Sequence, residues 1–459
     1  MRRIVALTLM VVSAFPAARL GAQIDPTEFA ARRQRMLAKA PDGLVVMHAF
    51  SRFKLWDEAG FHQDPAFYYF TGLANAHRAI LVLDGPGKES WLFVGPGRPA
   101  QNPDLTGFAA VTIDTSAATL ALLGVEHVAP WDRFIPFVDA WHAAHPTMPV
   151  YADGGGQTGG GMGYLSNPDG LGGIENPYLL WNAALHVRWH DLDVRDAFAI
   201  VDSVRAVKSP GEIALLEQAA TVTAAGFWAG VHAIAPGRTQ RQVEGQVVAG
   251  CMNAGSNGVS LWPWVRSGPY TLGPTLFEAF NDYANLNRTL RAGELVRLDV
   301  GCDAAMYKGD FGRTIPVSGH FDAGQREIME LLSGAYLAGV AVMRPGATPR
   351  EVFDATAAYI AAHQAALTTP LAREAAAAAV AHPGSWSIMH GLGLDMAEGA
   401  PATFEPGNVI CYEPLFTAGG QGFFVEDTWV ITATGHERVN PSIPYAPTDI
   451  ERAMKHSHG

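Results

Sequence analysis

The sequence predicts an α/β (α+β) protein made of two units, and three observations lead to this prediction. In the first unit, short apolar runs alternate with turn residues and helical patches, which is typical of a mixed sheet with helices around it. A Ser-Pro-Gly-Glu capping box at Ser209 then opens a long helical segment. The second unit also contains a short internal repeat, which predicts two related halves.

Residues 23–200 form the first predicted unit. Four apolar runs in it have the length of strands and are bounded by turn residues: 43–48, 79–84, 90–94 and 148–152. Pro149 places the last run at a sheet edge or at the start of a strand, because proline cannot donate a backbone hydrogen bond. Residues 153–173 are rich in glycine but lack the Gly-Lys-Ser/Thr of a phosphate loop, so we expect a surface loop there.

The second predicted unit spans residues 201–445 and is followed by a tail, residues 446–459. Its repeat consists of residues 236–243 (PGRTQRQV) and 345–352 (PGATPREV). Each copy has a threonine followed three residues later by Gln or Glu, which predicts a capped helix start. Capping chemistry alone can explain so short a copy. A duplicated half-domain, in which helix pairs cover a shared sheet, explains it better.

The first 22 residues have the pattern of a cleavable signal peptide. Arg2 and Arg3 precede an apolar stretch, residues 4–15, and the small pair Gly21-Ala22 follows as a cleavage site. The apolar stretch is too short to span a bilayer, and a buried N-terminal helix is the alternative. The sequence thus predicts a secreted or periplasmic protein that is not held in a membrane.

Charge and cysteine content narrow the function classes. The net charge is −12 at pH 7, and no basic run of the kind that follows a phosphate backbone occurs, which argues against nucleic-acid binding. The three cysteines, Cys251, Cys302 and Cys411, are far apart in the sequence. They suit buried small residues better than a disulfide framework, although one bridge stays open as an alternative.

Residues 295–314 (LVRLDVGCDAAMYKGDFGRT) contain two aspartates on two apolar runs. A short return between the runs would place Asp299 and Asp310 side by side. Two carboxylates buried together repel each other, and a divalent cation is the usual remedy because it prefers oxygen ligands. Two exposed aspartates at strand ends are the alternative if this stretch is taken alone.

Three further side chains are candidate ligands. His390 precedes a glycine-rich turn, and Glu413 ends the apolar strand predicted for residues 408–412. Glu426 interrupts a second apolar strand thirteen positions later, a distance that a hairpin closes. A charge within an apolar strand is costly unless it is compensated. Each of these alone can be structural, but four carboxylates and one imidazole together predict a two-metal site.

These motifs resemble the pita-bread metallopeptidases, the family of methionine aminopeptidase, prolidase and aminopeptidase P. The matching motifs of the second unit are the opening VRAVKSPGEI at residues 204–213, the spacing D-x10-D-x2-RT that begins at Asp299, the HGLGLD turn at His390, the Glu-Pro pair at Glu413 and the Glu-Asp-Thr at Glu426. In the first unit, residues 61–73 (FHQDPAFYYFTGL) resemble the N-terminal domain of aminopeptidase P. The similarity therefore covers nearly the whole chain after the predicted signal.

The resemblance implies a creatinase-like N-terminal domain, a pita-bread catalytic domain and two divalent metal ions, with manganese expected before cobalt, zinc or iron. The implied metal ligands are Asp299, Asp310, His390, Glu413 and Glu426, with a bridging water or hydroxide between the ions. Glu413 would also shuttle a proton from the nucleophile to the leaving amine. A short peptide is the implied substrate, and a homodimer or homotetramer is the implied assembly.

Four positions near the ligands depart from the family's pattern. Asp282 stands where the family has a histidine, and Ala397 stands in place of a second one. Trp386 and Phe424 replace a histidine and an arginine of the aminopeptidase P pattern. In the family, these residues bind the substrate and donate hydrogen bonds to the oxyanion. Losing one such hydrogen-bond donor commonly lowers the rate by about two to three orders of magnitude. We therefore expect Asp282, Trp386 and Phe424 to line a rebuilt substrate-binding pocket.

These departures leave three functions open. The first is a secreted aminopeptidase, similar to Xaa-Pro aminopeptidase, that hydrolyses the N-terminal peptide bond of short peptides. The second is a metal-dependent hydrolase or lyase of a non-peptide substrate on the same fold. It is motivated by the loss of all four family groups while the ligands persist, and the aromatic residues Trp262, Trp264, Trp386 and Phe424 would make the pocket more apolar unless they belong to the core. The third is a weakly catalytic metal-binding homologue.

Overall fold

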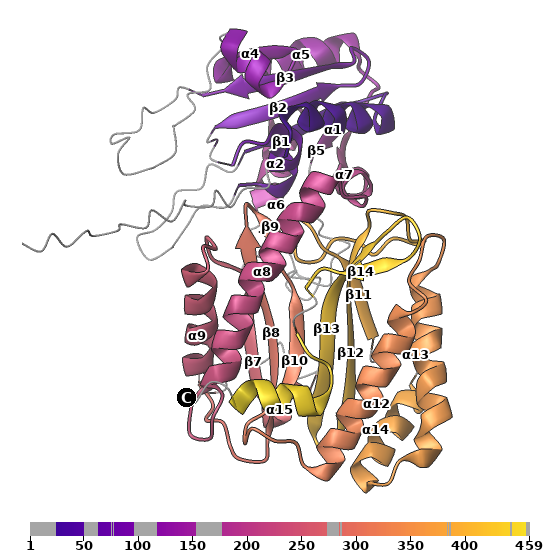
Figure 1. The fold of residues 1–459 in the computed structure, drawn as a ribbon. Coiled ribbons are helices and arrows are strands. Elements are labelled where there is room, and N and C mark those ends of the chain that lie inside the picture. Colours follow the sequence, from indigo (N-terminus) through magenta and orange to yellow (C-terminus); the bar gives the residue numbers. More distant parts are fainter. Residues whose placement is uncertain are drawn as a thin grey trace, which may run out of the picture.

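The computed structural model describes residues 24–49, 63–74, 76, 78–95, 117–152, 177–272, 284, 287–382, 384, 387–440 and 443–455. The predicted signal peptide, the glycine-rich stretch 153–173, Asp282 and Trp386 lie outside the described residues. The chain folds into two units, with the N-terminal unit above the C-terminal one in Figure 1.

The N-terminal unit is a six-stranded mixed sheet with helices around it. Its elements are α1 (Pro26–Lys39), β1 (Leu44–His48), α2 (Pro65–Thr71), β2 (Ala79–Asp84), β3 (Glu89–Val94), α4 (Ala117–Leu123), β4 (His127–Pro130), α5 (Phe134–Ala144), β5 (Val150–Ala152), α6 (Pro177–Arg188), β6 (Val194–Asp196) and α7 (Phe198–Arg205). The strand order is β4-β3-β2-β1-β5-β6. Two pairs are antiparallel, β1–β2 and β2–β3, and the other three are parallel.

The four apolar runs predicted as strands are confirmed as β1, β2, β3 and β5. The run in β1 is continuous because this strand is buried on both faces. Val45 and Met47 pack in one core with α1, whereas Leu44 and Val46 pack in another with α5. Pro149 directly precedes β5, which lies between β1 and β6, so it marks the start of a strand and not a sheet edge.

The C-terminal unit is built on an eight-stranded sheet. Its elements are α8 (Pro210–Ala233), α9 (Gln240–Asn253), β7 (Val259–Ser267), β8 (Leu295–Ala304), β9 (Tyr307–Lys308), β10 (Phe311–Pro316), α12 (Ala323–Val340), α13 (Pro349–His363), α14 (Pro370–Ala381), β11 (Ser387–Gly391), β12 (Val409–Ala418), β13 (Gln421–Ile431), β14 (His436–Arg438) and α15 (Pro447–Lys455). The strand order is β11-β12-β13-β10-β8-β7, with β14 beside β13 and β9 beside β8.

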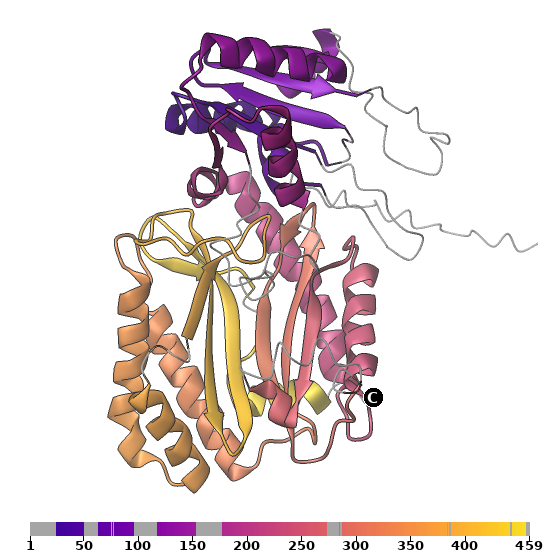
Figure 2. The same cartoon turned by 180° about the vertical axis from the view of Figure 1, so that it is seen from behind.

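Two groups of helices cover one face of this sheet. Helices α8 and α9 contact β8 and β7, while α12 and α14 contact β13 and β12. Figure 1 shows the helices in front of the strands, and Figure 2 shows the strands from the other side. The predicted repeat marks corresponding helices, because Thr239 and Thr348 each form a capping box at the start of α9 and of α13. The arrangement agrees with two related halves.

Side chains of the central strands alternate between the two faces of the sheet. Leu298 and Val300 of β8 share an apolar core with Phe227 of α8, so they face the helices. Arg297 and Asp299 consequently point to the opposite face, which is the one seen in Figure 2. The same alternation decides which side chains of β10, β12 and β13 can meet there.

A disulfide joins Cys251 of α9 to Cys302 of β8, and Cys411 is a buried free thiol. The preference for unpaired buried cysteines was therefore right for Cys411 and wrong for the other two. The pairing brings together residues 51 positions apart, which sequence spacing alone cannot show. Within the part of the chain that the structure describes, no helix is both long and apolar enough to cross a bilayer.

Candidate metal centre

The two aspartates of the central motif lie close together, one on strand β8 and the other just before its antiparallel neighbour β10. In the register of β8 and β10, Asp299 is opposite Gly312 and Val300 is opposite Phe311, so Asp310 lies just before β10 and close to Asp299. Both aspartates are 4% exposed. The alternative of two exposed strand-end aspartates is therefore wrong.

The other three predicted ligands come from the adjoining strands β11, β12 and β13. His390 of β11 is paired with Cys411 of β12, and the β12–β13 hairpin brings Glu413 towards Glu426. The Nε2 atom of His390 lies 3.6 Å from Asp310 Oδ2 and 3.6 Å from Glu413 Oε1. One detail of the prediction was wrong: Glu413 lies in the middle of a strand that continues to Ala418, since the hairpin turn comes later.

The ligand atoms form two overlapping groups. Within each group they all lie within 4.8 Å of one another; one contains Asp310, His390, Cys411 and Glu426, and the other contains Asp299, Glu413 and Glu426. Glu426 belongs to both groups, and its Oε2 atom is buried without a hydrogen-bond partner among the described residues. Converging buried carboxylates, one of them with an oxygen that accepts no hydrogen bond from the described residues, suit hard divalent cations, so these residues fit the predicted metal pair.

The carboxylates have raised pKa values, because burial disfavours their charged form. Burial raises the pKa of Glu413 to about 8. For Asp310 and Glu426, burial and then repulsion from the neighbouring carboxylates raise the pKa well above its ordinary value. Without a cation, such a cluster holds protons, and bound divalent ions would displace them.

His390 is oriented for ligation. Its Nδ1 atom lies 2.9 Å from the carbonyl oxygen of Gly391, so Nδ1–H donates to that oxygen and Nε2 faces the carboxylates. Burial lowers the pKa of His390, which favours the neutral imidazole that binds metals.

The Arg and Thr that follow Asp310 in the motif support the strands. Arg313 is fully buried on the helix side and donates to both carboxylate oxygens of Asp427 at 2.9 Å. On the ligand side, Thr314 Oγ1 accepts a hydrogen bond from the backbone of Phe424 at 2.7 Å. Thr428 Oγ1 donates to the backbone carbonyl of Asp310 at 2.7 Å, which fixes the chain at that ligand.

Sequence analysis missed three residues near this centre. Arg297 and Cys411 each precede a predicted ligand by two positions, so the period of two along a strand places them on the ligand face. Arg297 Nη2 lies 3.0 Å from Asp299 Oδ2 and 3.5 Å from Glu413 Oε2. The strand period is the signal by which both residues can be found.

The third missed residue, Glu398, anchors the turn after His390. Its backbone pairs with Gly391, and its carboxylate binds the buried Arg205 at the end of α7 and the buried Lys208 between α7 and α8. Burial opposes its charge, but these two cations outweigh burial and lower the pKa of Glu398 to about 2. No local pattern predicts this contact, because the partners are about 190 residues apart.

The aromatic residues proposed for the pocket lie in different places. Trp262 is 47% exposed, and its Nε1–H donates to Glu244 at 2.9 Å, away from the ligands. Trp264 lies opposite Asp299 in the strand register and contacts Arg297. Phe424 is fully buried, with the Arg297 guanidinium over its ring.

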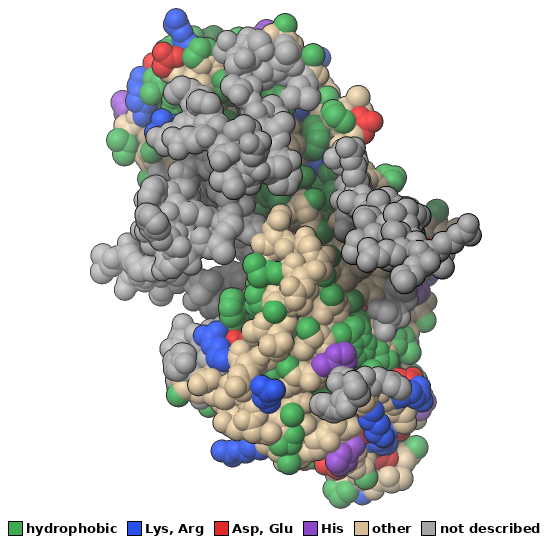
Figure 3. Space-filling view, turned by 60° about the vertical axis from the view of Figure 1, so that its left-hand side comes forward, with side chains coloured by type: hydrophobic (Ala, Val, Ile, Leu, Met, Phe, Trp, Pro, Cys, Tyr) green, Lys and Arg blue, Asp and Glu red, His purple; other side chains and the backbone are tan. Residues whose placement is uncertain are grey.

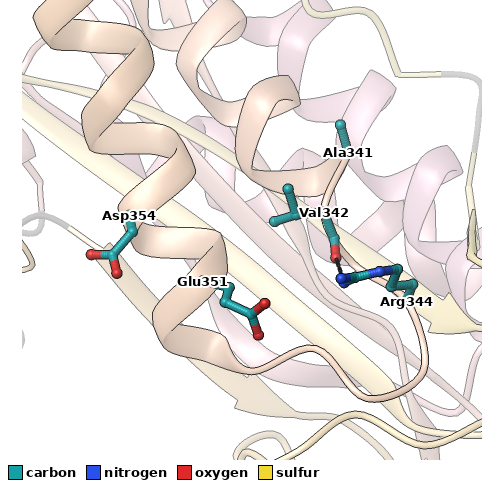
Figure 4. A pocket seen from close by; sticks show the side chains of 5 residues that line it. All are labelled: Ala341, Val342, Arg344, Glu351 and Asp354. Atoms are coloured by element: carbon teal, nitrogen blue, oxygen red, sulfur yellow. Dashed lines mark hydrogen bonds between the residues drawn. The ribbon is translucent and has the colours of Figure 1, made fainter.

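A hollow elsewhere on the C-terminal unit has a different character. Figure 4 shows its lining at the end of α12 and the start of α13: Ala341, Val342, Arg344, Glu351 and Asp354. Glu351 already accepts the helix-capping hydrogen bond from the Thr348 backbone, and Arg344 donates to a neighbouring carbonyl.

On the face seen in Figure 3, Lys and Arg side chains are scattered and do not form a basic patch.

Known proteins similar to this chain agree with the fold and the site. Metallopeptidase family M24 matches residues 214–433, and the aminopeptidase P N-terminal domain matches residues 29–145. The C-terminal unit therefore belongs to metallopeptidase family M24, and the N-terminal unit is an aminopeptidase P N-terminal domain. Membership of this family implies divalent metal ions.

Individual proteins that are similar to this chain agree with the same family and fold. The chain is 29% identical to the Xaa-Pro aminopeptidase of Escherichia coli (strain K12) over 56% of this chain and 60% of that protein, less than two thirds of its length. It is 24% identical to Xaa-Pro aminopeptidase 3 of Mus musculus over 94% of this chain and 86% of that protein. The structure of proline aminopeptidase P II from Yersinia pestis superposes with a TM-score of 0.70 at 24% identity, covering 94% of this chain and 100% of that one. The architecture is thus a creatinase-like domain followed by a pita-bread domain.

Proposed function

We propose that this chain is a metal-dependent aminopeptidase that removes the N-terminal residue from short peptides, with a preference for proline in the second position. The observation that carries the proposal is the convergence of four buried carboxylates and one oriented imidazole from adjacent strands, with Glu426 shared by two ligand groups. The similarity to Xaa-Pro aminopeptidases supports the substrate class.

In this proposal Asp299, Asp310, His390, Glu413 and Glu426 hold two divalent ions, manganese before cobalt, zinc or iron. Bound ions would supply an activated water and polarise the scissile carbonyl. Glu413 would accept a proton from the nucleophile and return it to the leaving amine, a role that its place beside His390 and Asp299 allows. Thr428 and the Gly391 carbonyl hold Asp310 and His390 in place.

The test is cleavage of Xaa-Pro peptides by protein loaded with manganese, cobalt or zinc. Asp299→Ala is expected to lower kcat/KM by more than about 100-fold, because even partners of metal ligands contribute 10- to 100-fold to metal sites. Release of the N-terminal amino acid is measured by mass spectrometry, with Asp354→Ala on the exposed surface of α13 as the matched control. Equally negligible turnover by the unmodified protein and Asp299→Ala would refute the peptidase function, and metal binding without peptide turnover would favour a non-peptide substrate.

We also propose that the protein is secreted or periplasmic, as the signal pattern predicts. The Cys251–Cys302 disulfide supports this, because such bonds persist in oxidising compartments. Protein purified from such a compartment and denatured without reductant is expected to titrate one free thiol, that of Cys411. Breaking the bond, which closes a loop over a 51-residue separation, is expected to lower stability by about 4 kcal/mol in thermal unfolding. Titration of three thiols would contradict this proposal.

A further inference from the structure

Arg297 lies inside the ring of metal ligands, although it is not one of them. It is 3% exposed, and it reaches the ligand face of the sheet from β8. Its Nη2 atom donates to Asp299 Oδ2 at 3.0 Å and lies 3.5 Å from Glu413 Oε2. One guanidinium thus touches two carboxylates of the Asp299–Glu413–Glu426 group.

Two aromatic side chains hold this guanidinium. Its carbon lies 3.7 Å from the centre of the Phe424 ring and 5.5 Å from that of the Trp264 ring. Arginine favours the faces of aromatic rings, and its plane stacks on them. Gly312 of the intervening strand β10 makes room for the Phe424 ring, since a Cβ at this position would come within 2.4 Å of it. The strands are therefore shaped to place Arg297 here.

The guanidinium also has hydrogen-bonding capacity that the described residues do not use. Arginine carries five N–H groups, and Arg297 Nε is buried without a hydrogen-bond partner in the described part of the chain. A buried donor without a partner is unfavourable. An oxygen atom of a bound ligand would satisfy it.

We propose that Arg297 is a substrate-binding residue, whose guanidinium donates to an oxygen of the peptide beside the metal ligands. This inference rests on the proposed peptidase function. The recognised oxygen belongs either to a peptide carbonyl or to the C-terminal carboxylate of a dipeptide, and both are acceptors that suit a guanidinium. Phe424 is in this view the support of the binding group, not a direct contact to the peptide.

The first experiment compares Arg297→Met with Arg297→Lys in binding and cleavage of an Xaa-Pro dipeptide. Arg297→Met is expected to raise KM by about 10- to 100-fold, the worth of a charge-assisted hydrogen bond. Arg297→Lys keeps the charge but not the planar fork, so an intermediate KM is expected. Arg350→Met on exposed α13 is the matched control. If Arg297→Met raises KM for the free dipeptide but not for its C-terminal amide, the recognised oxygen is that of the carboxylate.

Metal content separates this role from a structural one. Removing a cation next to the ligands is expected to leave metal affinity unchanged or higher in calorimetric titration with manganese, while peptide binding weakens. Adding Phe424→Arg to Arg297→Met is expected to restore part of the peptide affinity, because a side chain at 424 already lies against the guanidinium. Parallel loss of metal binding, melting temperature and peptide binding in Arg297→Met, without recovery in Arg297→Lys or the double variant, would overturn the proposal.

Peptide binding measured by calorimetry does not depend on turnover, so the two proposals can fail separately. Unmodified protein that binds the dipeptide through Arg297 but never cleaves it would refute the peptidase function alone. Unmodified protein that cleaves the dipeptide, together with an Arg297→Met variant of unchanged KM and binding, would refute the role of Arg297 alone.

Discussion

Glu426→Gln is expected to abolish metal binding at both halves of the centre and to stop peptide cleavage. Glu426 is the carboxylate that the two ligand groups share, and it is 1% exposed. An amide of the same size keeps one acceptor oxygen but loses the charge. Because even an outer partner of a metal ligand is worth 10- to 100-fold in metal affinity, we expect a loss of at least about 100-fold here. Manganese content after dialysis and calorimetric titration measure it.

The matched control for this variant is Glu437→Gln, an exposed carboxylate on β14 next to β13. It is expected to leave metal content and cleavage unchanged. Two ions per chain in Glu426→Gln, at the affinity of the unmodified protein, would show that Glu426 is not a ligand.

Glu398→Gln is expected to destabilise the C-terminal unit by about 3 kcal/mol, and its effect should be largest around His390. The substitution removes the carboxylate that the buried Lys208 binds and leaves Arg205 paired with the more exposed Asp395, and breaking a buried ion pair typically costs about 3–5 kcal/mol. The melting temperature should fall. Hydrogen exchange should become faster in residues 387–398, since Glu398 also accepts from the backbone of Leu394.

The same ion pairs give this effect a defined pH dependence. The pKa of Glu398 is about 2 in the folded protein and 4.5 as its ordinary value, so the folded state binds this proton less readily. Its stabilising contribution is therefore fully present above pH 4.5 and disappears as the pH falls towards 2. The difference in melting temperature between the unmodified protein and Glu398→Gln should shrink over this range. A difference that stays constant down to the lowest accessible pH would contradict the ion-pair origin.

Much of the fold was predictable because it depends on short stretches. Two kinds of feature depend only on residues that are close together in the sequence. They are the apolar runs of β1, β2, β3 and β5 and the capping boxes at Ser209, Thr239 and Thr348. Local hydrophobic pattern and helix capping need no distant partner, so they can be read from the chain directly.

The candidate centre was predictable only in part. The spacing of Asp299 and Asp310 and the hairpin spacing of Glu413 and Glu426 follow from strand pairing between neighbours in the sequence. Whether these two pairs and His390 meet depends on the order of the strands in the sheet, where β11, which carries His390, lies beside β12, and β10 lies between β8 and β13. The complete set of five candidate ligands was therefore predicted from the motifs taken together, and not from strand pairing.

The replacement of the family's arginine by Phe424 illustrates what the sequence alone cannot show. From the sequence, Phe424 indicates the loss of a cationic donor near the metals. In the structure, Arg297 from β8 reaches across β10 and places its guanidinium over the Phe424 ring. A positively charged side chain therefore does lie beside the predicted ligands, but it comes from β8 and not from β13.

The sequence by itself determined the α/β organisation and the helix starts, and it predicted the five residues that the structure brings together as candidate metal ligands. The tertiary structure decided that Cys251 pairs with Cys302, that Glu398 anchors the turn after His390, and that Arg297 lies among the predicted ligands. The physical reason is distance along the chain. Propensity, capping and strand period act locally, whereas these contacts exist only once strand order and helix packing have brought remote side chains to the same place.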